Sequence, residues 1–151
     1  MRAVIQRVSR AVVLVAGEAV GRIDRGLMVL AGAMHGDEDT DAAFIANKVC
    51  TLRVFPDEDG RMNLNVLDVD GAVLLISQFT LSADTASGSR PSFSKALAPE
   101  LAEPLVGRLA SLIEERGVAV EQGVFGAKMS VELVNDGPVT IVLDSQAKVR
   151  K

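Results

Sequence analysis

Apolar runs near the N-terminus predict β-strands. Residues 2–8 and 11–16 are rich in Val and Ile and are separated by the polar pair Ser9-Arg10, so they predict two strands, and a third is expected to end near Gly21. The run 26–32 is apolar on both faces, which is typical of a strand buried inside a sheet. The first part of the chain therefore predicts a sheet.

Two later segments carry apolar residues at helical spacing. The first follows a polar loop and predicts a helix from about 40 to 53, in which Asp39 or Thr40 can cap the first turn. The second predicts a helix from about 99 to 116 that stops at Gly117. Two main helices are therefore expected.

The remaining pattern predicts further strands and the loops between them. The strands are expected at 72–80, 118–124, 128–134 and 139–143. Segment 57–60 has the composition of a turn, and segment 82–94, which is rich in Ser, Gly, Asp and Pro, that of a long surface loop.

The order of these elements predicts an α/β fold class. Many strands with two interspersed helices indicate a single compact domain over residues 1–151, in which mixed β-sheets pack with two main helices and with one another. The chain is 48% hydrophobic and 24% charged, which is ordinary for a globular protein. Neither disorder nor a membrane span is indicated.

Composition also narrows the location and the partners. Polar residues within the first seven positions stand where a signal peptide would be apolar, so a cytoplasmic protein is expected. Cys50 is the only cysteine, which excludes an internal disulfide, and its apolar neighbours indicate a core residue more than a reactive thiol. The net charge of −4 argues against indiscriminate binding of nucleic acid, so an RNA partner would be held locally, with Arg90, Lys95 and segment 148–151 as candidates.

Most familiar catalytic patterns are missing from the sequence. His35 is the only histidine and lies in an acidic turn, which is typical of a solvated loop residue, and no nucleophile elbow, Walker loop or dinucleotide fingerprint is present. Two polar segments remain. At 77–80, hydroxyls and backbone N–H groups could face a pocket or simply satisfy the end of a strand. Gly137-Pro138 could be a tight turn between two antiparallel strands, in which a cis bond is possible.

These two segments resemble a known family. Ser77-Gln78-Phe79-Thr80-Leu81 and Asn135-Asp136-Gly137-Pro138-Val139-Thr140 are similar to the signature pair of the D-aminoacyl-tRNA deacylases (D-tyrosyl-tRNA deacylases), hydrolases that proofread mischarged tRNA. The similarity runs through nearly the whole chain and includes 1–9, 62–64, 90–93, 99–101 and 123–129.

The resemblance implies an architecture for the active site. It implies a compact α/β domain that forms a homodimer with the active site at the interface, uses no metal or organic cofactor and acts on aminoacyl-tRNA. Gly137-Pro138 would be a cis dipeptide inserted from one subunit into the pocket of its partner, where it would reject L-aminoacyl groups by steric clash. Glycine has no side chain to clash, so glycyl-tRNA is expected to be cleaved as well.

The resemblance also implies roles for other residues. Ser77, Gln78, Phe79 and Thr80 would hold the ester carbonyl through backbone N–H groups. The resemblance also implies that the 2′-OH of the terminal ribose helps activate water, which fits the absence of a base beside Thr80 in the sequence. Residues at the positions of Phe125 and Met129 help form the pocket for the terminal adenosine, although both could equally be plain core. Arg7 would hold the Gly-Pro loop by hydrogen bonds or, alternatively, form a strand salt bridge. The sequence departs from the family in the loop, where relatives often carry basic residues at the positions of Ala86-Ser87 and an aromatic residue at that of Ser82.

Two other functions stay open from the sequence. One is a hydrolase of small esters that uses Thr80 or Ser77 as a nucleophile, and the other is a module that binds the aminoacyl end of tRNA without turnover.

Overall fold

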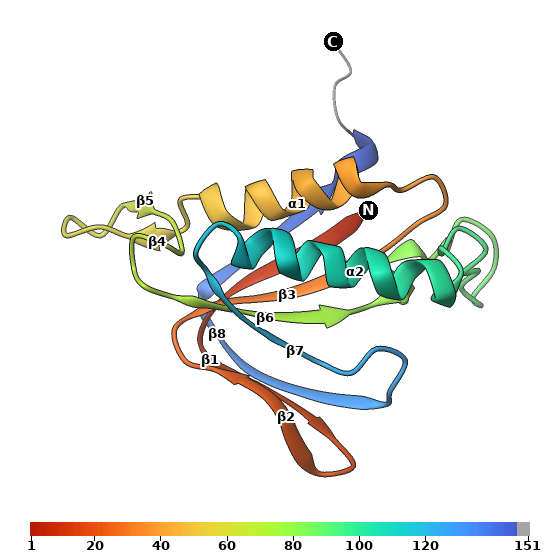
Figure 1. Cartoon of the computed structure of the whole chain (residues 1–151), viewed down its shortest axis with the longest axis horizontal. Coiled ribbons are helices and arrows are strands. Elements are labelled where there is room, and N and C mark those ends of the chain that lie inside the picture. Colours follow the sequence, from red (N-terminus) through yellow and green to blue (C-terminus); the bar gives the residue numbers. More distant parts are fainter. Residues whose placement is uncertain (148–151) are drawn as a thin grey trace.

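A six-stranded mixed sheet forms the framework of the protein (Figure 1). The computed structural model describes residues 1–147, so the basic segment 148–151 lies outside the described residues. The strands of the sheet are β1 (Arg2–Val15), β2 (Glu18–Ile23), β3 (Gly26–Gly32), β6 (Ala72–Ser77), β7 (Ala119–Gln122) and β8 (Met129–Asp144). Their order is β2-β1-β3-β6-β7, with β8 paired to β1. β1 is antiparallel to β2, β3 and β8, whereas β3, β6 and β7 are parallel. The predicted α/β fold with mixed sheet pairing is confirmed.

Two helices cover one face of this sheet (Figure 1). They are α1 (Asp39–Thr51) and α2 (Pro99–Glu114), both close to the predicted ranges. The cap of α1 differs from the prediction, because Glu38 takes the N-cap position and forms a capping box with Asp41, whose carboxylate accepts from the Glu38 backbone N–H at 2.9 Å. The apolar faces of both helices and of the central strands form the main core.

The N-terminal strand is longer than the sequence predicted. Residues 2–8 and 11–16 were expected as two strands, but β1 runs without a break through the exposed pair Ser9-Arg10. The pairing register of β1 with β8 shifts on both sides of Val8, and the other edge of β1 passes from β3 to β2 at the same place. The polar pair therefore marks an irregularity within one strand and not its end.

The C-terminal strand shows the same kind of difference. The predicted strands at 128–134 and 139–143 are two halves of β8, and both halves pair with β1. Asn135 pairs with Val8 and Thr140 pairs with Gln6, so the four residues between them stand opposite Arg7 alone. Segment 136–139 is thus a bulge, and its interpretation as a turn between two antiparallel neighbours is wrong.

The remaining elements are short. β6 ends at Ser77, earlier than the predicted limit of 80, and is followed by the 3₁₀ turn η1 (Phe79–Ser82). The strands β4 (Phe55–Pro56) and β5 (Met62–Leu64) flank the predicted turn at 57–60, and the 3₁₀ turn η2 (Ser145–Ala147) follows β8. β2 extends two residues beyond the expected end at Gly21.

A second apolar cluster lies on the face of the sheet away from the helices. It contains Val13 of β1, Ile23 of β2 and Ile76 of β6, with Met129 and Val131 of β8 packed against it. The sheet curls far enough to bring β2 beside β7, since a Cβ added at Gly21 would lie 2.7 Å from the carbonyl oxygen of Gln122. The expected packing of sheet on sheet is therefore made by one curled sheet. Among the described helices, none is long and apolar enough to span a membrane.

Candidate active site

A cavity of about 630 Å³ opens where β3 and β6 end. Nineteen residues line it: Ala31, Gly32, Ala33, Ile76, Ser77, Gln78, Phe79, Phe93, Ala96, Leu97, Ala98, Pro99, Ala102, Val106, Phe125, Gly126, Ala127, Met129 and Val131. None of these nineteen side chains, all within the described part of the chain, is ionisable. The cavity can therefore bind apolar and planar groups, and its polar contacts come from one side-chain amide, one hydroxyl and the main chain.

One wall of the cavity is the predicted segment at the end of β6. Ser77, Gln78 and Phe79 all line the cavity. The backbone N–H of Gln78 donates to the carbonyl oxygen of Ala31 at 2.8 Å, which ties the segment to β3. A Cβ added at Gly32 would lie 2.5 Å from the carbonyl oxygen of Gln78, so only glycine allows β3 to approach this closely.

The 3₁₀ turn after this wall is held from two sides. Ser82, 1% exposed, donates from Oγ to the carbonyl oxygen of Phe79 at 2.8 Å, and Arg2 donates from Nη1 to the carbonyl oxygen of Leu81 at 2.9 Å. Ser82 therefore stabilises the turn through a bond that an aromatic side chain at this position could not make. The bond from Arg2 was not predicted, because nothing in the sequence joins residues this far apart.

Thr80 is exposed, and its hydroxyl is not paired with a base. Thr80 Oγ1 accepts a hydrogen bond from Nε2 of Gln78, a neutral amide that cannot take a proton from the hydroxyl. Thr80 itself does not line the cavity. Its side chain thus has no activating partner among the contacts that the structure describes.

Phe125 and Met129 lie on another wall. Both line the cavity and are partly buried, and each also packs against an apolar cluster. Phe125 and Met129 thus belong both to a cavity wall and to the core, and their binding of the terminal adenosine stays a prediction. A Cβ at Gly123 would lie 2.6 Å from the sulfur of Met129, so the absence of a side chain there makes room for the thioether.

Several wall residues were not predicted from the sequence. Phe93 makes an edge-to-face contact with Phe79, with ring centroids 5.2 Å apart, and both rings are substantially exposed, at 38% and 57%. Ala102 and Val106 of α2 complete the wall. An aromatic residue beside a polar loop is a pattern that could have indicated Phe93 as a site residue. Ala102 and Val106, by contrast, have the pattern of ordinary core positions in a helix.

Arg7 contacts the bulge of β8. Its Nε donates to the carbonyl oxygen of Asp136 at 3.0 Å, and its Nη1 donates to the carbonyl oxygen of Val54 at 2.6 Å. Arg7 Nε also lies 3.4 Å from a carboxylate oxygen of Asp136. Both predicted kinds of contact, hydrogen bonds to the loop and a salt bridge, are therefore present, and the side chain that makes them is only 11% exposed.

Gly137 and Pro138 lie at the exposed tip of this bulge. Their peptide bond is cis, and Gly137 has a φ of 126°, which disfavours residues with a side chain. Asn135 supports the bulge, because its Oδ1 accepts from the Val139 backbone N–H at 3.2 Å. Neither Gly137 nor Pro138 lines the cavity formed by the same chain.

Other candidate residues have ordinary surroundings. Cys50 is buried, and burial raises the pKa of its thiol against the opposing charge of Arg116, as expected for an unreactive core cysteine. His35 and Arg90 are exposed, and Lys95 pairs with Asp84 at 2.8 Å. A hydrogen bond from Lys95 and its charge, with a backbone bond from Ala86, lower the pKa of Asp84.

Comparisons with known proteins identify the family. The family model described as D-Tyr-tRNA(Tyr) deacylase matches residues 4–144. The D-aminoacyl-tRNA deacylase of Thermus aquaticus is 55% identical over 148 residues, 98% of this chain and 97% of that protein. The one from Paracoccus denitrificans is 56% identical over 145 residues, 96% of this chain and 97% of that protein.

Two solved structures share the fold of this chain. A structure titled c-Myc DNA Unwinding Element Binding Protein superposes with a TM-score of 0.90 at 39% identity, covering 95% of this chain and 98% of its own. A probable eukaryotic D-amino acid tRNA deacylase shares the fold, with a TM-score of 0.81 at 16% identity, covering 94% and 97%. The chain belongs to the D-aminoacyl-tRNA deacylase family of ester hydrolases.

Proposed function

We propose that this protein hydrolyses the ester bond of D-aminoacyl-tRNA in the cytoplasm and releases free D-amino acid and tRNA, as a proofreading step in translation. The observation that carries the proposal is the cavity at the end of β6, which presents residues 77–79 but no ionisable side chain. Such a site can hold an aminoacyl ester and the end of an RNA strand, and it leaves the proton transfers to the substrate and to water.

The main chain of the 3₁₀ turn would stabilise the transition state. The N–H groups of Phe79 and Thr80 open η1, and the first N–H groups of a helix have no acceptor within it. They can therefore donate to the oxygen that becomes negative when water attacks the ester carbonyl. Ser77 and Gln78 would hold the substrate beside them. The 2′-OH of the terminal ribose would orient and activate the water, since no side chain of the cavity can serve as the base.

The other wall would bind the terminal adenosine. Phe125 offers an aromatic surface and Met129 a polarisable thioether, and both suit the flat face of a base. The apolar residues of α2 and segment 96–99 close this side of the cavity.

Selection against L-aminoacyl groups would come from a second subunit. Gly137 and Pro138 are exposed and do not line the cavity of their own chain, so a partner's copy of the bulge would have to reach it. The contacts from Arg7 and Asn135 hold the bulge in one shape. A backbone held in this way can occupy the space that an L side chain needs, and it thus reads chirality by exclusion.

An uncovered part of the sheet supports a homodimer. Val4 pairs with Val142 on one side and with Leu30 on the other. Gln6, two residues further along β1, pairs with Thr140. These five residues therefore share one face of the sheet. The helices cover the opposite face, where Ala3 and Ile5 belong to the core. Val142 is 71% exposed in the single chain. A second copy packed on this face would bury it and place the neighbouring bulge against the partner.

One assay tests the proposal. The protein is incubated with D-tyrosyl-tRNA, with L-tyrosyl-tRNA and with a small D-tyrosine ester, and the release of amino acid is followed over time. Loss of the D-aminoacyl-tRNA alone is the expected result. Glycyl-tRNA is also expected to be cleaved, because glycine has no side chain to exclude, and its resistance at enzyme levels that clear D-tyrosyl-tRNA would contradict the steric mechanism.

The same assay distinguishes the two alternatives. A small-ester hydrolase with Thr80 as nucleophile would cleave the free ester and ignore the tRNA, whereas a binding module would leave all three substrates intact. The lack of a base beside Thr80 disfavours the first of these.

A further inference from the structure

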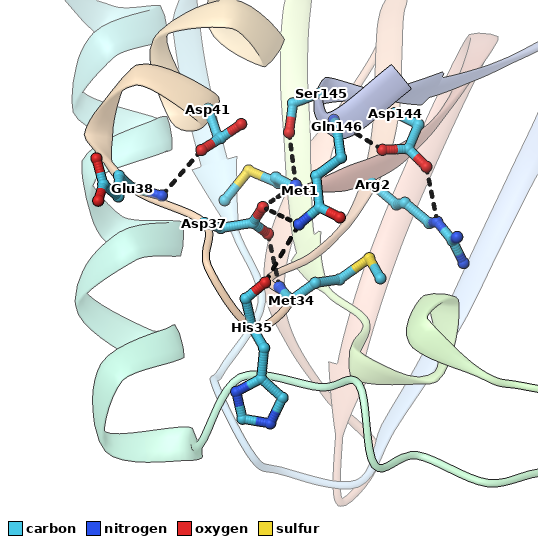
Figure 2. A network of polar contacts seen from close by, with 10 residues as sticks. All are labelled: Met1, Arg2, Met34, His35, Asp37, Glu38, Asp41, Asp144, Ser145 and Gln146. Carbon is cyan, nitrogen blue, oxygen red and sulfur yellow. Dashed lines mark hydrogen bonds and ion pairs between the residues drawn. The ribbon is translucent and has the colours of Figure 1, made fainter. Parts of the chain in front are cut away.

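A buried ionic cluster joins the N-terminal strand to the segment that follows β3 (Figure 2). The amino group of Met1 lies 2.5 Å from Oδ1 of Asp37 and donates to Oγ of Ser145 at 2.6 Å. The side chains of Met1 and Asp37 are both 0% exposed. Charged groups are this deeply buried only where each is paired and hydrogen-bonded, so the geometry around Asp37 is closely determined.

The second oxygen of Asp37 points to a different partner. Asp37 Oδ2 accepts from the backbone N–H of Met34 at 2.6 Å, and the Asp37 backbone N–H donates to the carbonyl oxygen of Met34 at 3.0 Å. Gln146 adds two bonds from Nε2, to Oδ1 of Asp37 at 3.1 Å and to the carbonyl oxygen of His35 at 3.2 Å (Figure 2). Asp37 thus stabilises the conformation of segment 33–37 through hydrogen bonds to Met34 in the same segment.

This segment continues directly into the wall of the cavity. Met34 forms a β-bridge with Ala96, and the Leu97 backbone N–H donates to the carbonyl oxygen of Ala33 at 3.0 Å. Ala33, Ala96 and Leu97 all line the cavity. A shift of Met34 would therefore move two sides of the cavity together, although Asp37 itself does not touch it.

We propose that Asp37 is a positioning residue of the active site, which holds the wall formed by Ala33, Ala96 and Leu97 through its paired contacts with the Met1 amino group and the Met34 backbone. The inference rests on the proposed function for its kinetic part only. The side chains of Ala33, Ala96 and Leu97 are apolar and offer no group to the charge that develops on the ester, so they should contact the substrate equally before and during the reaction. Loosening it should weaken binding and leave the chemical step nearly unchanged.

The test is the variant Asp37→Asn, compared with the unchanged protein. Asparagine keeps the shape of the side chain, but its NH₂ group cannot accept the bond from Met34 while its oxygen accepts from Met1. Amide hydrogen exchange at Met34 and Leu97 should accelerate by about tenfold while the amides of β1 keep their rates. For D-tyrosyl-tRNA, KM should rise by about tenfold and kcat should change by less than about threefold.

A matched control and a milder variant accompany this test. Asp57→Asn makes the same change at a partly exposed carboxylate that accepts from the backbone N–H groups of Asp59 and Arg61, away from the cavity, and should leave exchange at Met34 and Leu97 and the KM unaffected. Gln146→Ala removes only exposed contacts to the same segment. Gln146→Ala should accelerate hydrogen exchange at Met34 and Leu97 by a smaller factor than Asp37→Asn. If Asp37→Asn does not fold, the exchange rates of Gln146→Ala test the inference in its place.

Two results would overturn the inference. One is unchanged exchange at Met34 and Leu97 in the folded Asp37→Asn protein, or in Gln146→Ala if Asp37→Asn does not fold. The other is a fall in kcat at constant KM. If the unchanged protein fails to cleave D-tyrosyl-tRNA, the proposed function is wrong, and the exchange comparison still tests the role of Asp37 in holding the wall.

Discussion

Arg7 Nε donates to the carbonyl oxygen of Asp136 at 3.0 Å, so a side chain of β1 holds the backbone of the bulge directly opposite it in β8. The same guanidinium reaches the carbonyl oxygen of Val54 at 2.6 Å. One side chain thus ties the Gly-Pro bulge to the segment before β4. A planar group with several donors in a fixed fork suits this geometry, whereas a single ammonium does not.

Replacing Arg7 should therefore affect the bulge more than the fold. Arg7→Ala is expected to lower the free energy of unfolding by about 1–3 kcal/mol, because two carbonyl groups lose a charged donor. It should lower kcat/KM for D-tyrosyl-tRNA by at least about tenfold, and Arg7→Lys should restore only part of it. Urea denaturation and deacylation assays measure the two effects. Arg22→Ala, at an exposed position of β2, is the control, and an Arg7→Ala protein with unchanged kcat/KM would show that Arg7 has no part in the reaction.

Gly137 should not tolerate a side chain. A Cβ there would lie 2.8 Å from Arg7 Nη2 and 3.2 Å from the backbone nitrogen of Val139, at a φ of 126°. Gly137→Ala should displace the bulge and reduce the preference for D- over L-tyrosyl-tRNA. Gly17→Ala separates this clash from backbone strain alone, because Gly17 also has a positive φ but no atom within 4 Å of the added Cβ. The control should lose about 1 kcal/mol of stability and keep its stereospecificity.

Two substitutions at Thr80 distinguish its hydroxyl from its backbone N–H. Thr80→Ala removes only the hydroxyl and should keep kcat within about fivefold, because the hydroxyl has no base to activate it. Thr80→Pro removes the backbone N–H, which has no acceptor within η1, and should lower kcat by about 100-fold or more. Single-turnover kinetics and mass spectrometry are the measurements. An acyl group trapped on Thr80 would contradict this assignment.

The pair formed by Arg2 and Asp144 should make stability depend on pH. Burial is the largest single influence on the pKa of Asp144, and it acts to raise that pKa. Hydrogen bonds from the Arg2 side chain and the Gln146 backbone, together with the charges of Arg2 and the Met1 amino group, outweigh burial and lower the pKa below its usual value. The folded protein therefore binds this proton less readily than the unfolded chain. The resulting stabilisation is complete above the ordinary Asp pKa of about 3.9 and is lost as the pH falls through the lowered value.

Asp144→Asn should accordingly destabilise the protein at pH 7 and have a smaller effect near pH 2. Since both side chains are about one-third exposed, the difference at pH 7 should be no more than about 1 kcal/mol after solvent screening. Urea midpoints measured across the acidic range test this, and an equal effect at both pH values would exclude the ion pair as its source.

The sequence predicts those elements that local pattern alone determines. β3 is apolar at nearly every position, and α1 and α2 repeat their apolar residues at helical spacing, so each was found close to its observed range. β1 and β8 were each divided in two because Ser9-Arg10 and Gly137-Pro138 look like breaks. In the fold, pairing of each strand with the other carries it through the interruption, and no local pattern contains that information.

Local sequence pattern also predicted only one part of the candidate site. Segments 77–80 and 135–140 stand out as polar groups beside apolar strands. The wall from segment 96–99 and α2 consists mainly of small apolar residues that resemble any core, and Asp37 meets Met1 across 36 positions of sequence. In the proposed dimer the bulge would reach the cavity of the partner, an arrangement that sequence periodicity cannot describe.

The length of β8 has a consequence for what each chain of a dimer would contribute to the two active sites. Val131 in the cavity wall and Gly137 in the bulge stand on one strand about 20 Å apart, at roughly 3.3 Å per residue, so in the proposed dimer one chain would supply the two features to different sites. Two variants that are each defective in one of the two features should then complement each other. If Gly137→Ala and Thr80→Pro chains are unfolded together and refolded in equal amounts, half of the dimers would be mixed, and each of these would regain one intact site. The mixture should recover about a quarter of the original fast and D-selective sites, whereas neither variant alone can form such a site.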